Sequence, residues 1–71
     1  MKYFKTEYAY FMVLDKIAIM VQSFDNIRFY RIETMPNVDY HFTDNKTPIS
    51  ETEFKNEFLR VSLLIEETIN N

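Results

Sequence analysis

A chain of 71 residues with no cysteine and one histidine cannot form a disulfide or a thiolate metal site, and a zinc site would depend on carboxylate ligands. Its net charge of −3 argues against non-specific binding of nucleic acid, which requires a basic surface. No apolar run approaches the roughly 20 residues of a membrane-spanning helix, and the N-terminus lacks the apolar stretch of a signal peptide. We therefore expect a cytoplasmic protein without a cofactor, folded as a single domain over residues 1–71.

Short apolar runs separated by turn residues predict a β-meander in the first two thirds of the chain. The runs cover residues 8–14, 17–24, 27–34 and 38–43. The turns between them fall at Asp15-Lys16, Asp25-Asn26 and Met35-Pro36-Asn37. Residues 2–5 are a candidate for a fifth strand at an edge, and the run that begins at Tyr8 is also compatible with a first helical turn.

One strand register satisfies all three predicted hairpins. Two-residue loops pair Leu14 with Ile17, and Phe24 with Ile27. A three-residue loop pairs Thr34 with Val38. Because side chains alternate along a strand, this register gathers apolar or aromatic residues on one face. That face consists of Tyr10, Met12, Leu14, Ile17, Ile19, Val21, Tyr30, Ile32, Val38, Tyr40 and Phe42.

The last third of the chain predicts an amphipathic helix over about residues 51–69. Ser50 and Glu53 have the spacing of a capping box, and Ile49 and Phe54 that of a hydrophobic staple. A competing start uses the segment Thr47-Pro48, with threonine as the cap. At helical spacing one apolar stripe contains Phe54, Phe58, Val61, Ile65 and Ile69, with Leu64 beside it. This stripe should pack on the apolar sheet face, which gives an α+β fold of one antiparallel sheet and one C-terminal helix.

The opposite face of the predicted sheet is also largely apolar, and the expected function is inferred from this face. It consists of Ala9, Phe11, Val13, Ala18, Met20, Gln22, Phe29, Arg31, Glu33, Asp39, His41 and Thr43. One helix covers only one face, and a large uncovered apolar patch is typical of a contact site. Two interpretations follow: the patch binds another surface, or the chain's own N-terminal segment or helix flank covers it.

We expect a non-catalytic protein–protein interaction module that associates with itself through the open sheet face, as a homodimer or larger homo-oligomer. Such a module could act as a regulator or inhibitor of a larger protein, or as a subunit. Leu59 and Leu63 support association, because they lie opposite the packing stripe, where a monomeric helix is usually polar. The expected interface residues are Phe11, Val13, Met20, Phe29, Arg31, His41, Leu59 and Leu63.

The alternative function is a nucleic-acid-binding sheet that uses Arg28, Phe29 and Arg31 to contact phosphates and stack bases. Two acidic residues predicted on the same face, Glu33 and Asp39, argue against it. These two carboxylates are also the nearest approach to an acid–base pair, but the simpler interpretation is a solvated edge at which the two side chains point apart. Because no nucleophile, metal partner or oxyanion loop accompanies them, we do not expect an enzyme.

Overall fold

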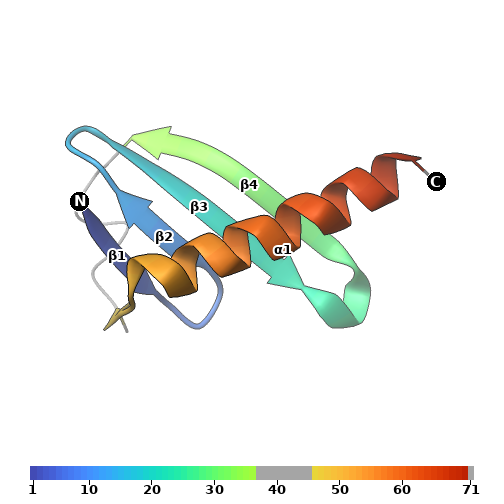
Figure 1. The fold of residues 1–71 in the computed structure, drawn as a ribbon, viewed down its shortest axis with the longest axis horizontal. Coiled ribbons are helices and arrows are strands. Elements are labelled where there is room, and N and C mark those ends of the chain that lie inside the picture. Colours follow the sequence, from blue (N-terminus) through green and yellow to red (C-terminus); the bar gives the residue numbers. More distant parts are fainter. Residues whose placement is uncertain (37–45, 71) are drawn as a thin grey trace.

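The computed structural model describes residues 1–36 and 46–70. Its elements are β1 (Lys2–Lys5), β2 (Tyr10–Val13), β3 (Ile17–Phe24), the short 3₁₀ helix η1 (Asp25–Ile27), β4 (Phe29–Pro36), β5 (Thr47–Pro48) and α1 (Glu51–Asn70). The strands form one antiparallel sheet in the order β4-β3-β2-β1-β5, packed against α1 (Figure 1). The predicted α+β class and the candidate strand at residues 2–5 are confirmed. The predicted strand 38–43 lies outside the described residues.

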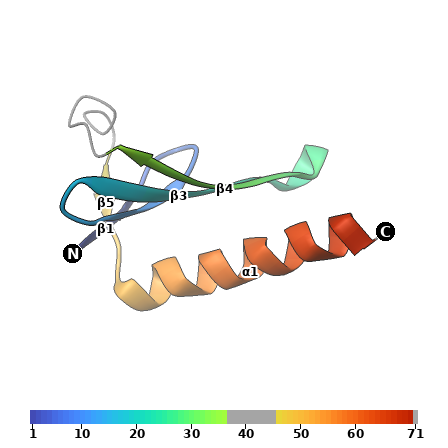
Figure 2. The ribbon, with the colours of Figure 1, turned by 90° about the horizontal axis from the view of Figure 1, so that it is seen from above.

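Helix α1 forms a separate layer on one side of the sheet. Figure 2 shows that it runs along that side from below β1 and β5 to the η1 turn between β3 and β4. Its start is the Ser50 cap, since the Glu53 amide donates to the Ser50 hydroxyl oxygen at 3.0 Å. The competing start is wrong, because the segment Thr47-Pro48 belongs to β5 and pairs with β1.

The β2–β3 hairpin has the predicted register. The Leu14 amide donates to the Ile17 carbonyl at 2.9 Å across the two-residue Asp15-Lys16 loop. Further along the hairpin, Tyr10 lies opposite Val21. This loop therefore sets the alternation of both strands, as the sequence predicts.

The β3–β4 hairpin has a longer loop than predicted. Phe24 pairs with Phe29 instead of Ile27, so the loop contains four residues, 25–28. A two-residue type I′ turn needs positive φ at both central residues, whereas this loop uses one left-handed residue, Arg28, with φ 54°. The register moves by two residues, and because strand alternation also has a period of two, every side chain keeps its predicted face.

The helix-facing side of the sheet is the main core. Val21 and Val61 are fully buried, and Phe54 is 3% exposed. The partly buried side chains packed around them are Tyr3, Tyr10, Met12, Ile19, Tyr30, Ile32, Ile49 and Ile65. The predicted contact between this sheet face and the helix stripe is confirmed for the strand residues of the cluster from Tyr10 to Ile32. Ile17, also predicted on this face, is 40% exposed, and Val38, Tyr40 and Phe42 lie outside the described residues.

The opposite face forms a second buried cluster. It contains Phe4, Ala9, Phe11, Ala18 and Met20, with Val13 and Met35 packed against it. The N-terminal strand contributes directly, because the Phe4 and Phe11 rings stack with centroids 5.1 Å apart. The Lys46 amino group also lies over the Phe4 ring, 5.5 Å from its centroid. The predicted membership of this face is confirmed for the described residues, but the expectation that it is open is wrong around Phe11 and Met20.

Candidate interaction surface

The structure separates the interface residues predicted from the sequence. Phe11 and Met20 are 7% and 8% exposed, so the chain's own core already uses their apolar surface. Val13 is half-buried beside them. His41 lies outside the described residues. The remaining four predicted residues lie on the surface, two on β4 and two on α1.

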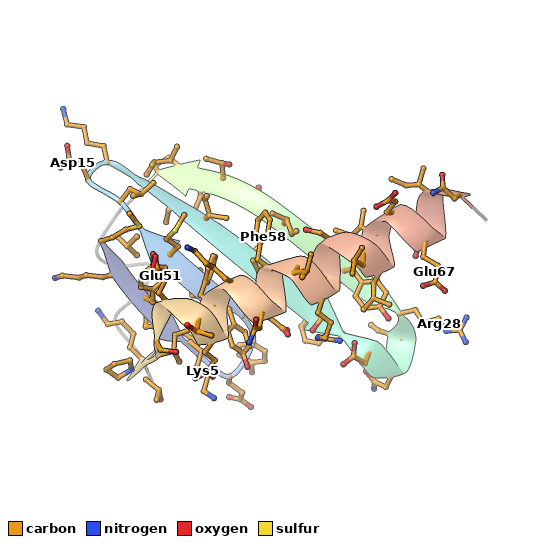
Figure 3. All side chains as sticks on the ribbon, in the orientation of Figure 1. Lys5, Asp15, Arg28, Glu51, Phe58 and Glu67 are labelled. Atoms are coloured by element: carbon orange, nitrogen blue, oxygen red, sulfur yellow. The ribbon has the colours of Figure 1, made fainter. Side chains whose placement is uncertain are left out.

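On α1, Leu59 and Leu63 remain on the surface. They are 58% and 55% exposed, and neither belongs to a buried cluster. They lie four residues apart, about one turn of the helix, so their side chains are neighbours and form an apolar strip. Phe58 adjoins this strip; it is 38% exposed, and Figure 3 shows it on the side of α1 turned toward β4.

Only part of the apolar stripe of the helix packs against the sheet. Phe54 and Val61 are buried, but Phe58 remains partly exposed and Ile69 is 77% exposed. Helical periodicity identifies these residues as apolar and co-facial, yet it contains no information on where the sheet ends. Sequence reasoning therefore missed Phe58 and Ile69 as surface residues.

Strand β4 is the outer strand of the sheet on the side away from β5. Its eight residues alternate between exposed and half-buried over most of its length, and no described strand pairs with its outer edge. Phe29, on this strand, is 44% exposed. Arg31 and Glu33 form an ion pair along the strand on the face away from the helix. Among residues 1–36 and 46–70 this edge has no partner strand, and such an edge of a long strand is a template for another strand.

The hydrogen-bonding pattern determines which backbone groups point out of this edge. Leu14 and Ile17 are a hydrogen-bonded pair of the β2–β3 ladder. Because hydrogen-bonded pairs recur at every second residue of an antiparallel ladder, the odd-numbered residues of β3 bond to β2. Even-numbered residues of β3 consequently face β4, where their partners are odd-numbered. The N–H and C=O groups of Tyr30, Ile32 and Thr34 therefore point away from the sheet.

A shallow cavity of about 230 Å³ lies where the second half of α1 passes the start of β4. The side chains around it are Arg28, Phe29, Tyr30, Ile65, Thr68 and Ile69. Its apolar and aromatic lining suits contact with an apolar side chain better than chemistry, because it holds no nucleophile beside a base. Among residues 1–36 and 46–70, no three metal-ligating side chains gather to form a metal site.

A polar cluster around Arg60 joins α1 to the end of β3 and to η1. It lies on the side of the helix opposite Phe58. The Arg60 guanidinium bonds Glu57 at 2.8 Å, Asp25 at 3.2 Å and the Ser23 hydroxyl at 2.7 Å. The hydrogen bond with Glu57, aided by Asp25, raises the pKa of Arg60, so the cation stays charged. Sequence reasoning missed this cluster, although Glu57 and Arg60 have the i,i+3 spacing of a helical ion pair.

At the start of the helix, a smaller group joins α1 to β1. The Tyr3 hydroxyl donates to the Glu51 carboxylate at 3.2 Å, and Lys55 lies 3.2 Å from the same oxygen. Partial burial, followed by the charge and hydrogen bond of Glu51, raises the pKa of Tyr3. The hydrogen bond and charge of Lys55 lower the pKa of Glu51. Both polar groups stabilise the position of the helix and leave its outward side available.

Neither a protein-family model, nor a curated protein, nor a solved structure matches this chain. Within the described residues, no helix combines the length and the apolar character needed to cross a membrane.

Proposed function

We propose that this chain is a non-catalytic protein–protein interaction module that associates with itself. The observation that carries the proposal is the exposed Leu59–Leu63 strip on α1. The two buried clusters are formed without these side chains, so the fold does not require leucine at either position. Burial against a second protein surface would remove this apolar area from water, which is the main driving force of association.

The surface of β4 supports the same proposal. Phe29 is 44% exposed and the Arg31 side chain 48%, and aromatic and arginine side chains are enriched at the centres of protein interfaces. The nucleic-acid alternative has less support, because the Glu33 carboxylate neutralises Arg31 on the same face. A base-stacking sheet would need that guanidinium for a phosphate.

Sedimentation velocity over a wide range of protein concentrations tests the proposal. We expect a dimer that dissociates on dilution, and we expect Leu59→Glu combined with Leu63→Glu to raise the dissociation constant at least about tenfold. Thr52→Glu combined with Asn56→Glu is the matched control, because it adds the same two charges at the same spacing on exposed positions of the same helix.

Two outcomes would count against the proposal. A wild-type chain that stays monomeric up to about 1 mM, where even weak specific complexes form, contradicts self-association. Self-association that survives the double leucine substitution contradicts the assignment of Leu59 and Leu63 to the interface. Circular dichroism of each variant confirms that the helix and sheet are retained.

A further inference from the structure

We propose that two copies of this chain join through the outer edges of their β4 strands, antiparallel and centred on Ile32, to form one continuous sheet. The inference rests on the proposed self-association, and it adds to the Leu59–Leu63 strip a second contact surface, the β4 edge, together with its register. A two-fold axis perpendicular to the sheet relates the copies, so both helices lie on the same face of the joined sheet.

The backbone of β4 is set up for this register. Ile32 directs its N–H and C=O outward, so two copies centred on this residue exchange both bonds of a hydrogen-bonded pair. In the same register, the outward N–H and C=O groups of Tyr30 lie opposite those of Thr34 in the second copy. The two-fold axis repeats this pair on its other side. Every outward N–H and C=O between Tyr30 and Thr34 thereby gains a partner.

The charges on the other face select this register over its neighbours. With Ile32 on the axis, Arg31 of each copy lies directly across from Glu33 of the other. A shift that moves the axis to position 31 places two arginines opposite each other, and a shift to position 33 places two glutamates opposite each other. Like charges directly across a strand pair are destabilising, whereas opposite charges are favourable. Charged side chains usually protect an edge from pairing, but this alternation is self-complementary.

The apolar side chains agree with the same arrangement. Phe29, 44% exposed in the single chain, comes to lie opposite Met35 of the second copy, where the thioether contacts the ring. On the helix face, Phe58 projects from the side of α1 turned toward β4, which is the side that faces the two-fold axis (Figure 3). The pairing therefore brings exposed apolar groups of both elements toward the second copy.

A single-cysteine variant tests the register, because the natural chain contains no cysteine. In an antiparallel hydrogen-bonded pair the Cα atoms are about 5.5 Å apart, which is within the range that a disulfide spans. We expect Ile32→Cys to form a covalent dimer under mild oxidation. Thr34→Cys is the control, since its counterpart in the second copy lies about 13 Å away along the strand.

Mixing charge variants tests whether Arg31 and Glu33 contact each other between chains. Arg31→Glu alone and Glu33→Arg alone each place like charges across the axis, and we expect each to raise the dissociation constant about tenfold. In a 1:1 mixture, the carboxylate introduced at position 31 faces the guanidinium introduced at position 33 of the other chain. We expect a heterodimer with the wild-type dissociation constant. If only the contact within one strand matters, the mixture gains nothing, because each chain retains its own like-charged pair.

The outcomes separate this inference from the proposed function. A dimer in sedimentation that fails to cross-link at Ile32→Cys, or cross-links equally at Thr34→Cys, overturns the inference and leaves self-association standing. A monomeric wild type overturns both. If the Ile32 amide is protected from hydrogen exchange in a monomer, another segment of the same chain occupies the edge, and the inference is wrong.

Discussion

Arg60 on α1 and Asp25 in the η1 turn are joined by an ion pair of 3.2 Å, which fixes the middle of the helix to the end of the β3–β4 hairpin. The same guanidinium holds Glu57, whose side chain is only 14% exposed. One arginine therefore connects α1 to a segment 35 residues earlier in the sequence, and it does so on the flank of α1 away from Phe58.

Replacing this arginine should weaken the fold measurably. We expect Arg60→Ala to lower the free energy of unfolding by about 1–2 kcal/mol, because it leaves the largely buried Glu57 carboxylate without its charged donor. Urea denaturation gives the value. Lys16→Ala, on the exposed β2–β3 loop, should change it by less than about 0.5 kcal/mol. Equal effects of the two substitutions would show that the Arg60 cluster contributes nothing beyond an ordinary surface charge.

The loop between β3 and β4 contains one residue with an unfavourable backbone conformation, Arg28, which a substitution by glycine should relieve. Arg28 adopts φ 54°, a region that costs a residue with a Cβ about 1 kcal/mol relative to glycine. We expect Arg28→Gly to raise the free energy of unfolding by about 0.5–1 kcal/mol. Asn26→Gly in the neighbouring 3₁₀ turn is the control and should lower it, since only flexibility is added there. Stabilisation by both substitutions would mean that the left-handed residue is not the source of the strain.

The same substitution should have different effects on the buried and the exposed side of α1. Val61 is fully buried, so Val61→Asp places an unpaired charge in the core and should abolish cooperative thermal unfolding. Leu63→Asp, two positions later and 55% exposed, should leave the fold intact in circular dichroism while weakening self-association. A folded Val61→Asp variant would contradict the packing of α1 on the sheet.

The contact between β1 and α1 should appear in pH titrations. The pKa of Tyr3 lies above its ordinary 10.0, so the stability from its protonated form is present below pH 10 and is lost as pH rises through the higher value. The pKa of Glu51 lies below its ordinary 4.5, so its contribution is present above pH 4.5 and is lost as pH falls through the lower value. Between these limits both contributions are constant.

Titration by nuclear magnetic resonance checks both directions. In the Glu51→Gln variant, the pKa of Tyr3 should fall toward 10.0 while staying above it, because burial remains its largest cause. An unchanged Tyr3 titration in that variant would exclude the hydrogen bond between the two side chains.

The faces of the strands could be read from the chain without coordinates. Alternation placed Val21 and Ile32 beneath the helix and Phe11 and Met20 on the other side, and the structure agrees. The prediction survived an error of two residues at the Phe24–Phe29 hairpin, because a shift by one full period leaves each face unchanged. A shift by one residue would have inverted β4.

The exposure of those faces could not be read in the same way. Phe11 belongs to a buried cluster because β1 brings the Phe4 ring against it, and no local pattern indicates that contact. The strand Thr47–Pro48 was missed for the same reason, since two residues carry no periodicity and their pairing with β1 depends on a partner more than forty residues earlier. Likewise, the helical period does not indicate that Phe58 is 38% exposed between the buried Phe54 and Val61.

By itself, the sequence determined the order of the hairpin strands and the C-terminal helix, which side of each of these elements is apolar, and Ser50 as one of two candidate starts of the helix. These properties depend on spacings of two to four residues along the chain. Only the tertiary structure decided which apolar sides are covered and that, among the described residues, β4 with its Arg31 and Glu33 is an outer strand of the sheet. Those properties arise from contacts between residues distant in sequence, and their free energy depends on geometry that local periodicity does not contain.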